Sequence, residues 1–495
     1  MSHPHPSPKD SHLATIVTMM SPLRLGLFLT APAALATAAA AVGQVHLGLL
    51  TAAVDCPQGI AVTFASNDSA PATVTLTTDD GGGDVSASTT VDFYAVDDGT
   101  YHYKSPYLHT AKLCNLAPST TYSYEIEDSD FDGAAFTSLP AVGDRNVPTV
   151  IGVVGDIGST DTEGTLRNVA TSLADSSASA HAVFIVGDFA YGNGEHEVWD
   201  DWFDAAQSVL STVPSVGING NHETIKGGGA HKDKKDVGPE NYLAYIKRVG
   251  VTTPATPEAL AALRTYYSID VGLVHCVFLD DYVGHRGKKD VVGTDAWRAE
   301  RARQLQWFQD DLTRVNRTAT PWTVVLKHNP YYNTFEDHQC KCSPERYAID
   351  DPEVCWDGVY DPSSDDASSK QPHCGLQAKF EDVYLEHGVD LVVAGHVHAY
   401  ERTAAIKKNQ VDWEDGVVYV TSGAGGQSPV DGYVDENPEW SVKTISDVAG
   451  GLRIVATADS LKAAWFANGK DTPDDEFTLT ADGTPEKAVA AKKGL

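Results

Sequence analysis

Side chains able to bind metal ions occur in five short motifs of this 495-residue chain, each placed at the end of an apolar run. The motifs are Gly155-Asp156-Ile157-Gly158, Gly187-Asp188-Phe189-Ala190-Tyr191, Gly220-Asn221-His222-Glu223, Val325-Leu326-Lys327-His328 and Gly395-His396-Val397-His398. Together they supply carboxylates, an amide oxygen, a phenol and imidazoles. Such a set of donors is typical of hydrolytic sites in which a shared carboxylate holds two metal ions.

The apolar runs before these motifs are rich in β-branched residues and predict buried strands. They cover residues 150–154, 183–186, 213–218, 324–326 and 391–393. Ligands at the ends of successive strands converge on one edge of a sheet, where α/β folds place their sites. Each motif alone has a simpler interpretation, such as a turn for Gly-Asp-x-Gly or a packed core tyrosine for Tyr191. Their common setting and order favour one binuclear site.

This series of motifs resembles the purple acid phosphatases, a branch of the binuclear metallophosphoesterases, from about His46 to Leu479. The branch is indicated by Gly-Asp-x-x-Tyr, which ends here at Tyr191. The resemblance implies that Asp156, Tyr191 and His398 bind Fe(III) and that Asp188 bridges the two ions. It also implies that Asn221, His328 and His396 bind a divalent partner, Fe, Zn or Mn.

The chemistry of the donors supports that distribution independently. A phenolate and carboxylates form a hard, anionic pocket that favours a trivalent ion, whereas two imidazoles and a neutral amide suit a borderline divalent ion. The resemblance further implies a violet colour, because a phenolate bound to Fe(III) gives a charge-transfer band.

The resemblance predicts an acid phosphatase, a phosphoric monoester hydrolase in which a metal-bound hydroxide attacks the ester. Fe(III) lowers the pKa of water more than a divalent ion does, so a nucleophile is available at acidic pH. The leaving alkoxide then requires a proton. We expect His222 to donate it, since the neighbouring Asn221 is an expected metal ligand and imidazole is protonated at acidic pH.

His338 is the second candidate proton donor, ten residues after His328. Plant-type enzymes of the family show two adjacent histidines here, whereas this chain has Asp337-His338. An aspartate facing the site would repel a phosphate dianion, so His222 is the preferred donor, and a loop histidine without a catalytic role remains an alternative for His338. Asn221, His222 and His338 are also expected to bind the substrate.

Three other functions use the same motifs. A phosphodiesterase or nucleotide pyrophosphatase would have the same metals, because substrate choice depends on loops around the site. A surface-binding protein with an inactive phosphatase domain is disfavoured, since it would be expected to lack a ligand and all seven are present. Peroxide chemistry would need iron at both metal positions.

The N-terminal residues 1–43 predict a secretory signal peptide and its leader. Arg24 precedes the apolar run 25–29, and Ala-rich sequence with candidate cleavage sites follows. A membrane span is disfavoured, because later segments lack the ~18 consecutive apolar residues that a span requires. The expected destination is therefore extracellular, or vacuolar or lysosomal through the secretory pathway.

Cysteine usage agrees with export. Of the seven cysteines, Cys276 lies in a strand-like segment and is expected to be a buried thiol. The other six are disulfide candidates, most simply Cys56–Cys114 and two bridges among Cys340, Cys342, Cys355 and Cys374. A zinc knuckle at Cys340-x-Cys342 is a less favoured alternative. Asn67 and Asn316 head N-glycosylation motifs.

The net charge of −32 argues against nucleic acid or an anionic membrane as a partner. Small phosphate esters remain suitable substrates, because two metal ions would dominate the local field in one cleft. The sequence leaves the oligomeric state open.

Two folded domains are expected. Residues 44–142 contain short alternating strands, among them 60–64, 73–76 and 121–126, and resemble the fibronectin type III-like β-sandwich that precedes the catalytic domain in plant-type relatives. Residues 143–484 alternate strands with helices, which predicts an α/β domain. The resemblance implies that this domain is a calcineurin-like metallophosphoesterase αββα sandwich, and a tail is expected at 485–495. Apolar side chains at helical spacing are Leu166, Val169, Ala170 and Leu173; Trp199, Phe203, Ala206 and Leu210; and Leu305, Phe308, Leu312 and Val315.

A last helix is expected around residues 380–386, ending before Gly388. Residues 339–375 hold four cysteines and are rich in Asp, Ser and Pro. They are expected to form either a disulfide-stapled loop beside the site or a solvated surface insertion.

Overall fold

The computed structural model describes residues 39–78, 83–97, 101–171, 173, 179–224, 240–285, 291–336, 340, 374–429, 432–433 and 438–481. The chain divides into two units, Met1–Ala38 and Ala39–Leu495, and only the second contains described residues. Residues 1–38 of the predicted signal peptide and leader, His338, Cys342, Cys355 and the tail from 485 lie outside the described residues.

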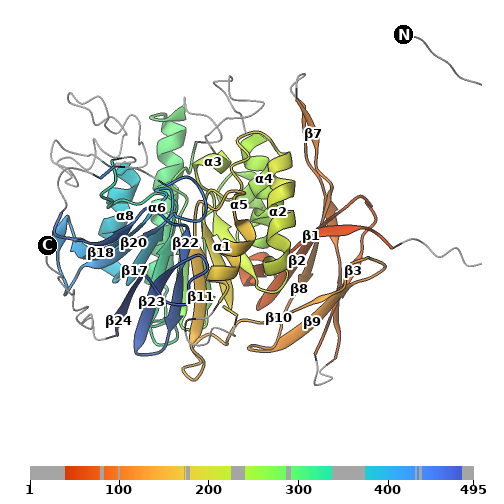
Figure 1. Cartoon of the computed structure of the whole chain (residues 1–495), viewed down its shortest axis with the longest axis horizontal. Helices are drawn as coiled ribbons and strands as arrows, with labels where there is room; N and C mark the ends of the chain where they lie inside the picture. Colours follow the sequence, from red (N-terminus) through yellow and green to blue (C-terminus); the bar gives the residue numbers. More distant parts are fainter. Residues whose placement is uncertain are drawn as a thin grey trace, which may run out of the picture. The chain divides into compact units, whose positions relative to one another are not determined.

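The first part of the chain forms an antiparallel β-sandwich (Figure 1). One sheet has the order β1-β2-β8-β5 and the other β10-β9-β3-β4. Inward side chains of both sheets, among them Leu47, Val62, Leu76 and Tyr124, share one hydrophobic cluster. The strands are β1 (Val42–Leu50), β2 (Gly59–Ser66), β3 (Thr73–Thr77), β4 (Val85–Ser88), β5 (Thr90–Asp92), β8 (Tyr107–Leu113), β9 (Thr121–Ile126) and β10 (Ala134–Thr137). The predicted sandwich is confirmed.

Two smaller elements complete this part. A short 3₁₀ helix, Ala52–Val54, follows β1. A two-stranded hairpin joins β6 (Ala95–Asp97) to β7 (His102–Lys104). The predicted Cys56–Cys114 disulfide is present and connects the turn before β2 to the end of β8.

The second part of the chain contains two mixed sheets. The six-stranded sheet has the order β13-β12-β11-β22-β23-β24, with β11, β12 and β13 parallel. Its strands are β11 (Thr149–Val154), β12 (Ala182–Val186), β13 (Ser215–Ile218), β22 (Gly450–Ala456), β23 (Ser460–Ala467) and β24 (Asp475–Thr480). The parallel strands are fully buried, which explains why their sequences are almost entirely apolar.

The eight-stranded sheet has the order β14-β15-β16-β17-β20-β18-β19, with β21 paired to β18. Its strands are β14 (Tyr267–Val271), β15 (Val274–Phe278), β16 (Trp322–Leu326), β17 (Leu391–Ala394), β18 (Tyr400–Lys407), β19 (Gln410–Val411), β20 (Val417–Ser422) and β21 (Ser441–Ile445). Buried residues of the two sheets, such as Phe184 and Phe278, pack against each other in the same cluster.

Helices cover the outer faces of both sheets, so the predicted αββα sandwich is confirmed (Figure 1). Helices α1, α2 and α4 pack on the six-stranded sheet, and α6 and α8 pack on the other. The helices are α1 (Thr162–Val169), α2 (Glu197–Leu210), α3 (Asn221–Thr224), α4 (Glu240–Arg248), the 3₁₀ turn Gly250–Thr252, α5 (Pro257–Ala261), α6 (Asp295–Thr313) and α8 (Cys374–His387). No helix among the described residues is both long and apolar enough to cross a membrane.

Several helix ends differ from the periodicity-based expectation. α1 ends at Val169, so Leu173 lies beyond it, and α6 ends before Val315, which nevertheless packs against the core. α8 begins at Cys374 rather than near 380, because its first turn is tied to Cys340 by a disulfide and buried against the sheet.

The Cys340–Cys374 disulfide means that Cys340 cannot be a zinc ligand, so the zinc-knuckle alternative is wrong. Cys276 is the expected buried free thiol.

Candidate metal centre

Each of the five motifs lies at the end of a strand, and these strand ends meet at one common edge of the two sheets. Asp156 follows β11 and Asp188 follows β12, and the amide of Asp156 donates to the carbonyl of Gly187 over 3.1 Å. Asn221 follows β13 in the same parallel set. On the facing sheet His328 and His396 follow the paired parallel strands β16 and β17. The structure thus brings together residues that are far apart in the sequence.

The backbone turns sharply where the ligand candidates stand. Asp156, Asp188, Tyr191 and His396 have left-handed φ angles of 59°, 54°, 58° and 67°. Non-glycine residues in this region carry strain that the surrounding structure must offset, a pattern concentrated at functional sites. Glycine is needed beside them: a Cβ on Gly220 would lie 2.1 Å from Oδ1 of Asp188.

One group of donor atoms is centred on the His328 ring. Its Nε2 lies 3.1 Å from Nδ1 of His396 and 3.4 Å from Oδ2 of Asp188. The amide oxygen of Asn221 lies 3.0 Å from the same Nε2. Ligand atoms of Asp188, His328 and His396 all lie within 4.8 Å of one another, and all three residues are buried. Imidazole, carboxylate and amide donors at this spacing fit a borderline divalent cation.

A second group is centred on the Tyr191 hydroxyl. It donates to Oδ1 of Asp156 over 2.9 Å and lies 2.9 Å from Nε2 of His398. That Nε2 is 3.6 Å from Oδ1 of Asp156. Phenol and carboxylate oxygens joined by one imidazole form a harder donor set than the first group, which fits a more highly charged cation.

Backbone carbonyls orient two of the imidazoles. Nδ1 of His328 lies 2.8 Å from the carbonyl oxygen of Val186, and Nδ1 of His398 lies 2.8 Å from that of Ser428. A ring nitrogen facing a carbonyl must carry the proton, so Nε2 of each neutral ring keeps its lone pair. This is the usual outer-shell arrangement of metal-binding histidines.

The electrostatics of this edge stabilise positive charge. Burial lowers the pKa of His328, but the carboxylates of Asp188 and Asp156 outweigh it and raise the pKa to about 10. Burial likewise raises the pKa of Asp188, but the imidazoles of His328 and His222 outweigh it and hold the carboxyl well below its usual range. Among the described residues, no arginine or lysine pairs with Asp156 or Asp188, and protonated imidazole balances their charge. A metal cation can replace the protonated imidazole as the counter-charge.

Glu223 is a buried residue of the site for which the sequence predicts no role. Its carboxylate, 1% exposed, accepts backbone N–H bonds from Asp188 (2.8 Å), Phe189 (2.9 Å) and Gly220 (2.8 Å). It therefore fastens the loop after β12 to the loop after β13. Burial, followed by the charge of Asp188, raises its pKa to about 8. The signal was available, since Glu223 is the last residue of the Gly220-Asn221-His222-Glu223 motif.

A buried ion pair supports His328 from the other side. Oδ2 of Asp281 accepts the backbone N–H groups of His328 (3.0 Å) and Asn329 (2.7 Å), and Oδ1 pairs with Nζ of Lys327 at 2.8 Å. None of the five motifs contains Asp281, because it follows the end of a different strand, β15.

His222 lies at the solvent side of the centre. Its ring centroid is 4.1 Å from that of Tyr191, its Nε2 is 3.9 Å from Oδ2 of Asp188, and its side chain is 21% exposed. Nδ1 lies 2.5 Å from Oδ1 of Asn193, a contact that the sequence did not predict.

The two predicted glycosylation acceptors, Asn67 and Asn316, are both exposed, as such acceptors must be.

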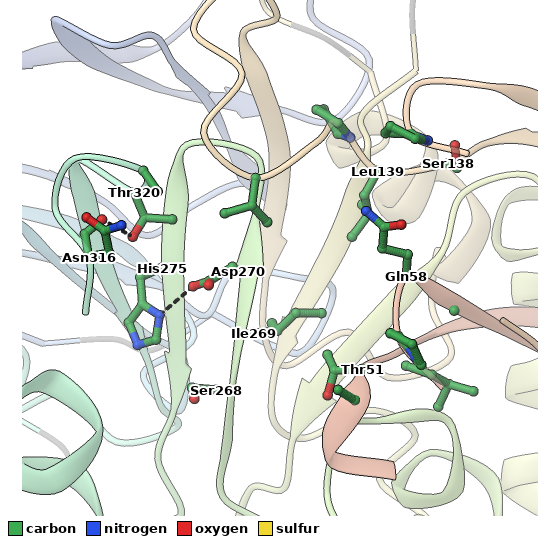
Figure 2. Close-up of a pocket in the computed structure, with 18 of the residues that line it drawn as sticks. Thr51, Gln58, Ser138, Leu139, Ser268, Ile269, Asp270, His275, Asn316 and Thr320 are labelled. Atoms are coloured by element: carbon green, nitrogen blue, oxygen red, sulfur yellow. Dashed lines mark hydrogen bonds and ion pairs between the residues drawn. The ribbon is translucent and has the colours of Figure 1, made fainter. Parts of the chain in front are cut away.

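A separate cavity of about 540 Å³ lies where the β-sandwich meets β14 and the end of α6. It contains none of the seven ligand candidates. His275 is held there between Oδ1 of Asp270 (2.7 Å, Figure 2) and Oδ2 of Asp311 (3.0 Å). Burial lowers the pKa of His275, but the two carboxylates outweigh it and raise the pKa to about 9.

Comparison with known families agrees with this architecture. Residues 149–400 match the family model of the calcineurin-like phosphoesterases. Because this match covers more than half of the chain, the chain belongs to the calcineurin-like phosphoesterase family. Residues 43–138 match the model described as purple acid phosphatase, N-terminal domain.

Related proteins narrow the assignment. Purple acid phosphatase 1 of Ipomoea batatas is 25% identical over 388 residues, which cover 74% of this chain and 69% of that protein. Purple acid phosphatase 23 of Arabidopsis thaliana is 28% identical over 357 residues, 66% of this chain and 64% of that protein. Within the larger family, the chain falls in the purple acid phosphatase branch and is a phosphatase.

Solved structures share the fold. The purple acid phosphatase PPD1 from seeds of yellow lupin, Lupinus luteus, superposes with a TM-score of 0.67 at 20% identity, covering 89% of this chain and 74% of that one. The structure of PhoD superposes with a TM-score of 0.60 at 12% identity, covering 91% of this chain and 93% of that one.

Proposed function

We propose that this phosphatase hydrolyses phosphate monoesters at acidic pH with two metal ions, Fe(III) and a divalent ion. The single observation that carries the proposal is the convergence of two donor groups, one around Nε2 of His328 and one around the Tyr191 hydroxyl, at one sheet edge.

The harder donor group would hold Fe(III), and the imidazole-rich group would hold Fe, Zn or Mn. Asp188 would bridge them. The proposed ligands are therefore Asp156, Tyr191 and His398 for the first ion and Asn221, His328 and His396 for the second. A relative from Arabidopsis thaliana, 23% identical over 386 residues, carries the name Fe(3+)-Zn(2+) purple acid phosphatase 12, which supports this pair. When bound, the ions act as Lewis acids toward the ester and toward water.

His222 would supply the proton to the leaving alkoxide. The Asn193 oxygen faces its Nδ1, so Nδ1 carries one proton and Nε2 points toward Asp188 and the centre. Its partial exposure allows a substrate to approach. Together with Asn221 it would also bind the phosphate. His338 remains the second candidate for both roles.

Export through the secretory pathway is part of the proposal. Two disulfides, Cys56–Cys114 and Cys340–Cys374, support an oxidising compartment. We also propose the domain limits 44–142 and 143–484, supported by the change from antiparallel sandwich to mixed sheets between β10 and β11.

The test combines three measurements on the protein purified from the medium of a secreting host. We expect two metal ions per chain by elemental analysis, a visible charge-transfer band, and faster turnover of a phosphate monoester than of the matched diester at acidic pH. Faster turnover of the diester would identify a phosphodiesterase instead. A colourless protein with two divalent ions would contradict the Fe(III) assignment.

A further inference from the structure

The short loop 192–196 connects the ligand candidate Tyr191 to α2 in a strained conformation. Tyr191, Asn193 and Gly194 all have left-handed φ angles, of 58°, 49° and 95°. Left-handed non-glycine residues are strained and persist only where neighbours hold them. The loop therefore depends on contacts at both of its ends.

The first end of the loop holds the proposed proton donor. The side-chain oxygen of Asn193 lies 2.5 Å from Nδ1 of His222, and the His222 ring packs on Tyr191. The loop also packs tightly on α2, since a Cβ on Gly192 would lie 3.0 Å from Cδ1 of Trp199. A shift at the start of α2 would consequently move Asn193.

The second end of the loop is fixed by the N-terminal β-sandwich. His196 precedes α2 and makes no side-chain capping bond to it. Its backbone N–H instead donates to the hydroxyl of Tyr101 over 2.8 Å, and that hydroxyl donates to Oε2 of Glu197 over 2.5 Å. Tyr101 directly precedes β7, which lies beside α2 (Figure 1). A residue of the N-terminal domain thus satisfies a donor at the helix N-terminus.

The hairpin that carries Tyr101 is itself anchored on the catalytic part. The hydroxyl of Tyr103 donates to Oδ2 of Asp200 in α2 over 2.9 Å and accepts from Nη2 of Arg248 in α4 over 2.9 Å. Arg248 is 1% exposed and also pairs with Asp200. The ring of Tyr103 lies 5.5 Å from that of His196 at an interplanar angle of 24°. A buried charged network of this kind holds the hairpin in one place.

We propose that Tyr101 is a positioning residue for the phosphatase reaction: from the N-terminal sandwich it fixes loop 192–196 and, through Asn193, the imidazole of His222. This inference rests on the proposed role of His222 as proton donor. It gives the N-terminal domain an indirect part in catalysis, exerted through the position of His222, which a separate binding module would not have.

The test compares Tyr101→Phe with the control variant Tyr107→Phe. Tyr107 lies in the neighbouring strand β8, where its ring packs against Phe93. Tyr101→Phe should lower kcat for alkyl phosphates about 3-fold to 10-fold, the size expected for one lost hydrogen bond, and leave activated aryl phosphates nearly unchanged. Metal content should stay at the wild-type value. Amide hydrogen exchange in residues 191–198 should rise by a similar factor in Tyr101→Phe only.

Three results would overturn the inference: wild-type kcat for alkyl phosphates in Tyr101→Phe, an equal loss for alkyl and aryl esters, or unchanged amide exchange. Failure of the proposed function is recognised separately. An inactive wild-type protein, or a His222→Ala protein with no leaving-group dependence, would contradict the role of His222, while the exchange measurement still tests the contact of Tyr101 in the same samples.

Discussion

Nδ1 of His396 lies 3.1 Å from Nε2 of His328, although the residues are 68 positions apart in the chain. The contact follows from strand pairing, because β16 and β17 are parallel neighbours with Leu326 opposite Val393. His328 and His396 therefore leave adjacent strands at the same edge. The left-handed φ of 67° at His396 then turns its ring toward its neighbour.

The proposed bridging role of Asp188 predicts loss of both metal ions in Asp188→Ala. Its Oδ2 faces His328, and its Oδ1 accepts the backbone N–H of His222 over 2.9 Å. Truncation therefore removes the proposed bridging ligand and also a contact that holds His222, the proposed proton donor. Elemental analysis after gel filtration measures the metal content. Asp295→Ala, at an exposed carboxylate, is the matched control. Two ions per chain in Asp188→Ala would contradict the bridging assignment.

Tyr191→Phe should abolish the visible charge-transfer band and leave measurable hydrolysis. The phenol is lost, but Asp156 and His398 keep their 3.6 Å approach and can still hold a cation with Asp188. Absorption spectra recorded alongside metal analysis separate loss of the chromophore from loss of iron. A mutant that keeps both its iron and its visible band would show that Tyr191 is not the charge-transfer ligand.

Glu223→Gln should weaken metal binding about 10-fold to 100-fold, the usual cost of changing an outer-shell partner. Oε2 accepts the N–H groups of both Asp188 and Gly220, and an amide NH₂ in that position cannot accept either. Competition with a chelator measures the affinity, and Glu258→Gln, on the exposed side of α5, is the control. Equal chelator resistance in the two variants would refute this role of Glu223.

The His275 cluster predicts a pH-dependent contribution to stability. Its pKa is raised from 6.5 to about 9, so its stabilisation is complete below pH 6.5 and is lost as the pH rises through 9. This pKa shift corresponds to at most about 3 kcal/mol of folding stability. Solvent screening lowers that contribution, because the Asp270 side chain is half-exposed. Urea unfolding should show His275→Gln less stable than wild type at pH 6 and nearly equal to it above pH 9.5. His102→Gln, at an exposed ring paired with Asp97, should change little at either pH. A pH-independent difference for His275→Gln would rule out its titration as the cause.

Local pattern predicts the β-sandwich, the α/β character of the second domain and the seven residues at the strand ends, whereas the αββα layers are predicted only by the family resemblance. Buried strands such as Thr149–Val154 are apolar along nearly their whole length, and the motif after each one contributes a residue to the shared edge. Local pattern does not single out Asp281, Asn193 or Tyr101, because the contact that gives each its interest is with a residue distant in sequence. The early start of α8 at Cys374 was also missed, since a disulfide and sheet packing rather than helical periodicity determine it.

The proposed proton donor gives the most discriminating prediction. His222→Ala should lower kcat by roughly 10²–10⁴ for esters with poor leaving groups, the usual range for general-acid catalysis. Activated aryl esters should lose much less, because their phenolates depart without a proton. Metal content should be retained, since Asn221 rather than His222 faces His328.

The pH profile adds an independent readout to the same variant. The basic limb of the wild-type profile should report deprotonation of the acid, so it should flatten in His222→Ala. His338→Ala, the comparison variant, should change mainly KM if that histidine only orients the phosphate. Equal losses for good and poor leaving groups in His222→Ala would exclude it as the acid. A leaving-group-dependent loss in His338→Ala would then transfer the role to His338.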